Sequence, residues 1–286
     1  INEQGEYTFE RGDRIIEFAE ENNMLVRGHT LVWHQQTDDW FFRDEEGNLF
    51  GEEEMLIRLK TYINTVLDHY RGKEYAWDVV NEAISDKPGE FFREDTDWFR
   101  TCGPEYVEKA FVFAKEADPE IKLFYNDYNL IDPDKSQKVY EMVKDFQVRG
   151  IPIDGVGMQG HWTLEDVNKE NLGNAIDLFA SLGMEVQITE LDLSIYPFYH
   201  NIDRDSLPKE VKEFTEELEL KQAEKYGEIF EVLREKSDIV TSVTFWGVAD
   251  NKTWLSNYFV RGRTDHPLLF DSNYKPKQAL EDIMDF

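Results

Sequence analysis

The chain has 286 residues, of which 41% are hydrophobic and 14% aromatic, enough for one well-cored α/β domain or two small ones. Sixty acidic residues against 31 basic ones give a formal net charge of −29, which disfavours nucleic acid and anionic membrane surfaces as partners. The single cysteine, Cys102, excludes an internal disulfide and a cysteine-rich metal site, and no apolar run approaches membrane-spanning length.

Strand and helix patterns alternate along the whole chain. Residues 9–21 begin the series as a helix, and short apolar runs then alternate with apolar residues at helical spacing. The predicted strands are 25–33, 75–83, 122–127, 156–161, 185–193 and 239–248. The further predicted helices are 52–70, 104–117, 134–149, 165–182, 210–236 and 276–285. This alternation, without a Pro/Gly/Ser-rich linker, predicts a parallel sheet with helical crossovers in one domain, 1–286.

Two kinds of parallel sheet fit that alternation, the doubly wound sheet and the closed barrel. No glycine-rich phosphate loop follows a predicted strand, so the nucleotide-binding doubly wound sheet lacks its main support. Polar groups recur instead near the C-terminal ends of different strands: Glu82, Asn126, His161, Glu190 and Trp246. A (β/α) barrel builds its active site from such a ring, so the sequence favours the barrel.

Two of these strand-end groups are glutamates. Glu82 and Glu190 each follow an apolar strand, where a lone carboxylate would ordinarily be a helix cap or half of a buried ion pair. If both face one cleft, they form the pair used for glycoside hydrolysis, one neutral as acid and the other ionised as nucleophile or base. A separation of about 5–5.5 Å would predict retention of configuration and about 6.5–9.5 Å inversion, and the sequence leaves this open.

The side chains around the glutamates suit a sugar. Tryptophans near strand ends can stack on pyranose rings, although a single tryptophan is more often a core residue; these are Trp33, Trp162, Trp246 and Trp254. Neutral amides that could bond hydroxyls are Gln36, Asn81, Asn126 and Gln159.

A metal site is the competing interpretation. It would use His29, His34 and His161 with Asp127 or Glu190. His29 and His34 differ in parity along their strand, however, and no HxH or HExxH spacing occurs. We therefore predict neither a metal nor another cofactor.

Six motifs in order carry a resemblance to a known family. They are VRGHTLVWH at 26–34, WDVVNEA at 77–83, YNDYN at 125–129, GMQGH at 157–161, ITELD at 188–192 and TFWG at 244–247. Together they resemble the family 10 glycoside hydrolases, which are endo-β-1,4-xylanases with a (β/α)8 TIM barrel and retain anomeric configuration. The resemblance covers essentially the whole chain and implies xylan or xylo-oligosaccharides as substrate.

The resemblance also implies roles for individual residues. Glu82 would be the general acid/base and Glu190 the nucleophile, with Asn81 on the 2-hydroxyl of the sugar at the cleavage site. His161 would orient Glu190, beside Gln159. His29 and Trp33 would line the subsite of the sugar at the cleavage site, and Gln36 would line the next glycone subsite. Trp246 and Trp254 would cover these glycone subsites. Asn126 and Tyr128 would lie nearer the acid catalyst and the leaving group.

Two rival functions remain open at this stage. A β-1,4-glucanase from another barrel family would also place glutamates at comparable strand ends. A catalytically silent sugar-binding barrel would keep the fold, although both glutamates are present.

The resemblance implies two further strands and a helix before Ile1, the second strand ending in an Asn and a Lys. We therefore expect that the chain as given lacks the first two barrel strands and that six strands leave the barrel unclosed. The oligomeric state is open, and so is the location, cytoplasmic or secreted. The stretch 254–270 looks more like intracellular bacterial members, which favours cytoplasmic.

Overall fold

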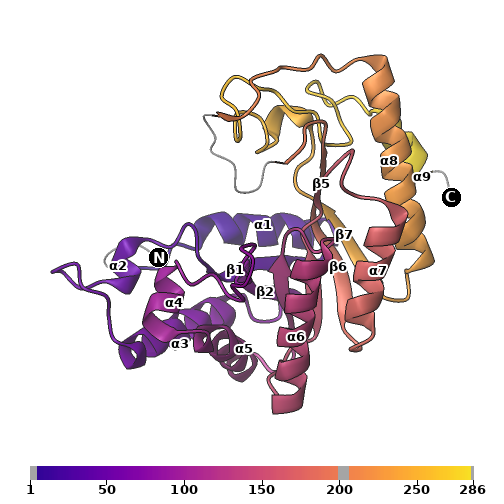
Figure 1. Cartoon of the computed structure of the whole chain (residues 1–286). Coiled ribbons are helices and arrows are strands. Elements are labelled where there is room, and N and C mark those ends of the chain that lie inside the picture. The colour runs from indigo at the N-terminus through magenta and orange to yellow at the C-terminus, as the bar shows by residue number, and fades with distance from the viewer. Residues whose placement is uncertain (1–4, 199–205, 285–286) are drawn as a thin grey trace. The chain divides into compact units, whose positions relative to one another are not determined.

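The computed structural model describes residues 5–198 and 206–284 (Figure 1). Its contacts divide the chain into two compact units, Ile1–Asp127 with Gln137–Val156, and Tyr128–Ser136 with Gly157–Phe286. Residues 199–205, between the predicted strand 185–193 and the predicted helix 210–236, and the last residue of the predicted helix 276–285 lie outside the described residues. Each unit has its own strands, helices and buried core.

The first unit is built on three parallel strands, β1 (Arg27–Trp33), β2 (Ala76–Asn81) and β3 (Lys122–Asp127). β2 pairs with both β1 and β3, and all of its residues are buried. A strand covered on both faces is expected to be mostly apolar, which explains why 75–83 shows no regular polar alternation. The C-terminal ends of β1, β2 and β3 therefore lie at one edge of this sheet.

Helices complete the first unit: α1 (Glu10–Glu21), α2 (Asp39–Phe42), α3 (Glu52–Tyr70), α4 (Asp97–Cys102) and α5 (Glu105–Ala117). α3 and α5 pack against each other (Figure 1). The bounds of α3 match the prediction, and its apolar stripe through Met55, Leu59 and Ile63 is fully buried. α2 and α4 were not predicted, because helices this short show no periodicity; the Thr96 hydroxyl caps α4 by accepting from Phe99 N (3.2 Å).

The second unit is built around β6 (Glu185–Ser194), which pairs in parallel with β5 (His161–Thr163) and β7 (Val240–Phe245). Its helices are α7 (Lys169–Ala180), α8 (Glu216–Glu235), α9 (Gln278–Met284) and the 3-10 turn η2 (Asp250–Lys252). α6 (Pro133–Arg149) and β4 (Gly155–Met158) contain residues of both units. None of the described helices is long and apolar enough to cross a membrane.

The structure corrects the single strand predicted over 156–161. β4 ends at Met158, β5 begins at His161, and Gly160 between them has a φ of 80°. A Cβ at Gly160 would lie 2.9 Å from Ile188 Cγ2, so glycine is required there for the close approach as well as for the torsion. Only Gln159 and Gly160 separate the two strands, and so short a break leaves no signal in the periodicity.

A second correction concerns the helix predicted over 210–236. α8 begins at Glu216, where the Thr215 hydroxyl accepts from Leu218 N (3.3 Å). The acidic residues at 216, 217 and 219 then lie in the first turn, where the positive end of the helix dipole stabilises them.

The loop after β7 is fixed by a buried ion pair at Asp250. Asp250 Oδ2 accepts from Lys277 Nζ (3.2 Å), and Oδ1 accepts from Leu268 N (2.8 Å). Burial lowers the pKa of Lys277, although the neighbouring Asp250 raises it in part. This pairing fixes the loop that carries Trp254.

Candidate active site

Glu82 lies just past the end of β2, in an unusual backbone conformation. Its φ is 58°, in the left-handed region that costs a non-glycine residue roughly 1–3 kcal/mol. Its N–H donates to Asn126 O (2.9 Å), and its carbonyl accepts from Arg93 Nε (2.9 Å). Strand alternation therefore does not set the direction of this side chain; the left-handed turn does.

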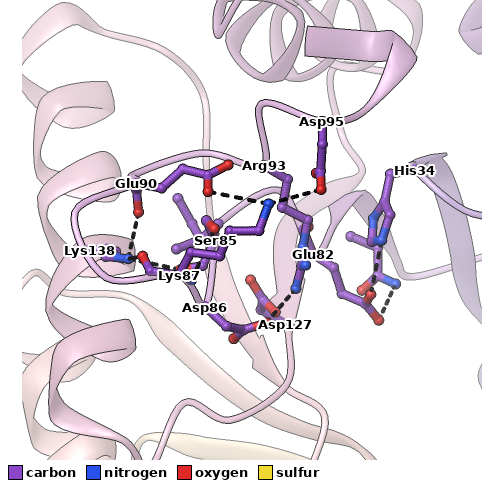
Figure 2. A network of polar contacts seen from close by, with 12 residues as sticks. His34, Glu82, Ser85, Asp86, Lys87, Glu90, Arg93, Asp95, Asp127 and Lys138 are labelled. Carbon is purple, nitrogen blue, oxygen red and sulfur yellow. Dashed lines mark hydrogen bonds and ion pairs between the residues drawn. The ribbon is translucent and has the colours of Figure 1, made fainter. Parts of the chain in front are cut away.

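The Glu82 carboxyl group accepts hydrogen bonds at both oxygens. Trp33 Nε1 donates to Oε2 (3.0 Å), and Asn81 Nδ2 donates to Oε1 (3.2 Å). His34 Nε2 lies 4.0 Å from Oε2, and Figure 2 shows its ring facing the carboxyl group. With 8% of the residue exposed, the carboxyl group is held firmly and is still open to a ligand.

A second amide orients Asn81. Asn126 is completely buried, and its Nδ2 donates to Asn81 Oδ1 (3.0 Å). Because the carbonyl oxygen of Asn81 is thereby occupied, its NH2 group is directed to Glu82. Asn126, Asn81 and the Glu82 carboxyl group are thus linked in that order by two hydrogen bonds.

β1 supplies His29, its third residue, and Trp33, its last. Trp98 Nε1 donates to Trp33 O (3.0 Å), which fixes the strand end. His29 Nδ1 lies 2.9 Å from Asp78 Oδ2, and Asp78 also pairs with Arg27. Burial raises the pKa of Asp78, but the charges of Arg27 and His29 outweigh it and hold that pKa below its ordinary value.

Neither Asp78 nor Trp98 was predicted from the sequence to be a site residue. An aspartate inside an otherwise apolar strand was the available signal for Asp78, because a buried charge requires a partner. Nothing local marks Trp98, which contacts Trp33 across 65 positions of sequence.

In the second unit, Glu190 lies within β6 and is paired with a histidine. Glu190 N donates to Gln159 O (2.7 Å), and its Oε2 lies 3.1 Å from His161 Nε2. The other ring nitrogen of His161, Nδ1, lies 2.9 Å from Asp192 Oδ1. Burial by itself lowers the pKa of His161, but Asp192 and Glu190 together raise it to about 10. His161 is therefore an imidazolium that donates to both carboxylates.

Two tryptophans border this histidine. Trp254 Nε1 donates to Asp192 Oδ2 (2.7 Å), and its ring centroid lies 4.9 Å from that of His161. The Trp246 centroid lies 6.4 Å from His161, and 38% of Trp246 is exposed. The fully buried Asp192 was missed as a site residue, although its place two positions after Glu190 puts it on the same face of the strand.

The sequence of this chain matches a known protein family over its full length. The model described as Glycosyl hydrolase family 10 matches residues 1–286. The chain belongs to glycosyl hydrolase family 10. Membership of family 10 confirms the predicted barrel class, and the protein is a glycoside hydrolase.

Curated relatives agree with the family assignment. A β-1,4-xylanase of Dictyoglomus thermophilum is 51% identical over 98% of this chain and 76% of its own length. Endo-1,4-β-xylanase B of Paenibacillus barcinonensis is 47% identical over 96% of this chain and 80% of its own length.

Solved structures are equally similar. The crystal structure of a xylanase from Paenibacillus barcinonensis with a conduramine derivative has a TM-score of 0.91 and 46% identity. The match covers 98% of this chain and 82% of that one. A mutant structure in complex with xylotriose has a TM-score of 0.92 and 45% identity, covering 100% of this chain and 84% of that one.

The remaining predicted residues of this family 10 chain lie in varied surroundings. Gln36 is exposed, with a φ of 57°, and Gln159 is buried. Lys135 Nζ lies 3.6 Å from the centre of the Tyr128 ring. Trp162, one of the tryptophans considered for stacking, is only 2% exposed and belongs to the core. Contacts of these residues with sugar stay predictions.

Metal ligands were the alternative chemistry for the histidines. Within 5–198 and 206–284, no group of three or more His, Cys, Asp and Glu side chains is arranged to hold a metal ion. His29 and His161 are each bound to a carboxylate instead.

Proposed function

We propose that this family 10 enzyme is a retaining endo-1,4-β-xylanase in which Glu190 is the nucleophile and Glu82 the general acid/base. The observation that carries the assignment is His161, which sits as an imidazolium between Glu190 and Asp192. An adjacent cation stabilises the carboxylate form, which is the form that a nucleophile needs. Similarity to relatives named as xylanases supports the substrate class.

The two glutamates have different environments, as an acid and a nucleophile require. Glu190 faces a cation, whereas the Glu82 carboxyl group accepts from two neutral groups, the Trp33 indole and the Asn81 amide. In this assignment Glu190 attacks as the ionised nucleophile, and Glu82 supplies the proton to the leaving oxygen.

The reaction proceeds by two displacements. Glu190 attacks the anomeric carbon and forms a glycosyl–enzyme ester while Glu82 gives its proton to the leaving oxygen. Glu82 then takes a proton from the water that breaks the ester, and the two inversions restore the original configuration. This mechanism requires the two carboxyl groups to be about 5–5.5 Å apart when substrate is bound.

Other residues bind the sugar in this proposal. The Asn81 amide, which Asn126 orients toward Glu82, bonds the 2-hydroxyl at the cleavage site. His29, Trp33, Gln36, Trp246 and Trp254 contact glycone sugars, and Tyr128 lies toward the leaving group. Exposed indole faces such as Trp246 suit the apolar faces of xylose rings.

Replacing the nucleophile tests the assignment. Glu190→Ala is expected to lower kcat on xylan at least about 10⁴-fold, because no covalent intermediate can form. The matched control is Glu185→Ala, at the start of the same strand, where the side chain contacts Thr241 and Gln187. Xylan hydrolysis by Glu190→Ala at the unmodified rate would contradict the proposal.

The same assay distinguishes the rival functions. Faster hydrolysis of carboxymethyl cellulose than of xylan would indicate a glucanase, and binding of xylo-oligosaccharide without product would indicate a silent barrel. Proton NMR of the first product tests the stereochemistry, since retention yields the β-anomer before mutarotation.

A further inference from the structure

The loop that follows β2 folds back onto Glu82, the residue just past the end of that strand. Ile84 and Phe92 form an antiparallel bridge, and Ser85 N donates to Phe91 O (2.9 Å). At the end of this loop Arg93 N donates to Ala83 O (2.9 Å). The chain therefore returns to Glu82 within eleven residues and brings the Arg93 side chain beside it.

Arg93 contacts the backbone of Glu82 and a neighbouring carboxylate. Its Nε donates to Glu82 O (2.9 Å), and its second guanidinium nitrogen donates to Asp86 Oδ2 (2.8 Å). Figure 2 shows the arginine between the loop and Glu82. With 18% of its side chain exposed, the guanidinium is largely buried, and these contacts fix its position.

A separate contact holds the loop itself. Lys138, on α6, donates from Nζ to three loop carbonyls, Glu90 O (2.6 Å), Ser85 O (2.8 Å) and Lys87 O (3.3 Å) (Figure 2). Because these contacts and the Ile84–Phe92 bridge do not involve the Arg93 side chain, the loop is expected to survive its replacement.

We infer that Arg93 is a positioning residue that holds the acid/base Glu82 in its left-handed conformation, an inference that rests on the proposed function. The N–H of Glu82 is bound to Asn126 O and its carbonyl to Arg93 Nε, so both peptide planes around its φ of 58° are fixed. Removing the arginine frees the carbonyl and lets the backbone turn toward an ordinary torsion. The carboxyl group then moves away from Trp33 Nε1 and from the leaving oxygen.

Leaving-group dependence separates this role from a general loss of structure. Departure of a sugar alkoxide needs the proton of Glu82, whereas a dinitrophenolate leaves without one. Arg93→Met is therefore expected to lower kcat/KM on xylohexaose roughly 10²-fold, the scale of a 1 Å misplacement. On dinitrophenyl β-xylobioside, kcat/KM is expected to stay within about threefold, because glycosylation then depends on Glu190 alone.

Three variants complete the design. Lys87→Met removes another cation of the same loop, one that pairs with Asp95 and Glu90. It is expected to leave kcat/KM unchanged on both substrates. Asp86→Asn removes the negative charge of the second acceptor of Arg93 and keeps the Glu82 contact, so it is expected to show a smaller selective loss. Arg93→Lys keeps a donor and is expected to recover part of the rate on xylohexaose.

Two results would overturn the inference: equal losses on both substrates in Arg93→Met and Arg93→Lys, or no loss on xylohexaose. Glu82→Gln separates failure of the inference from failure of the proposed function. If Glu82→Gln loses xylohexaose activity but retains dinitrophenyl activity while Arg93→Met matches the unmodified enzyme, only the inference fails. If Glu82→Gln keeps its activity on xylohexaose, the assignment of Glu82 as the acid/base fails, and the inference about Arg93 fails too.

Discussion

At the scale of single residues, the same kind of contact, an aspartate–histidine pair, occurs in both units. In each unit a buried aspartate holds a histidine that lies in a strand, Asp78 for His29 and Asp192 for His161. A histidine bound through one ring nitrogen has its ring plane fixed, so its other nitrogen points in one direction. In the second unit that direction is the carboxyl group of Glu190, the proposed nucleophile.

The charge of His161 yields a prediction about stability and pH. Its folded pKa, about 10, lies above the ordinary value of 6.5, so its pairing contributes fully below about pH 6.5 and is lost as the pH rises toward 10. His161→Gln is therefore expected to lower the free energy of unfolding most at about pH 6, and the difference should shrink steadily to about pH 10.

Urea unfolding of both proteins at several pH values measures that difference. His69→Gln is the matched control, because His69 pairs with Asp13 at a partly exposed position where ion pairs contribute little. A difference for His161→Gln that grows with pH would contradict the imidazolium assignment.

At the scale of elements, the break between β4 and β5 is what places His161. β5 pairs with the end of β6 in a register that sets His161 opposite Asp192, and Asp192 N donates to Gly160 O (3.2 Å). If the strand ran without a break from 156 to 161, His161 would not lie in this register opposite Asp192. The glycine torsion therefore decides which residue of β6 the histidine contacts.

Two glycines with positive φ allow the cost of the backbone torsion to be measured apart from the cost of a steric contact. Gly160→Ala is expected to destabilise the fold by about 2–4 kcal/mol, from the left-handed torsion together with overpacking against Ile188. Gly183→Ala, with a φ of 73° and open space around its Cβ position, should cost only about 1 kcal/mol. Thermal unfolding compares the two, and equal losses would mean that contact with Ile188 has no effect.

At the scale of the whole molecule, the net charge of −29 opposes the compact state. Added salt screens this repulsion, because the Debye length falls to about 8 Å at physiological ionic strength. Raising sodium chloride from about 20 to 300 mM is expected to raise the unfolding midpoint by about 2–4 °C.

Sucrose at matched osmolality is the control, since it changes hydration without screening charge. A midpoint that fell with salt would mean that local ion pairs, such as Lys60–Glu116, outweigh the net repulsion.

Much of this protein follows from sequence because the relevant signals are local or ordered along the chain. Helical spacing predicted α3 over 52–70, and β3 at 122–127 also matched. The two strand-end glutamates and six ordered motifs pointed to the family that the comparison assigns. Apolar periodicity and motif order are properties of neighbouring residues, so they require no knowledge of tertiary contacts.

Tertiary structure alone decided how those residues are held. The left-handed turn of Glu82, the Asp192–His161 pair and the return of Arg93 to Glu82 depend on partners apart in sequence or on backbone torsions. Neither leaves a periodic signal, because hydrogen-bond partners are selected by the fold and a torsion is set by the contacts on both sides of it. Local patterns and motif order are therefore enough to identify the family and to propose its catalytic groups, whereas the orientation of those groups and the charge of His161 depend on contacts made only in the folded chain.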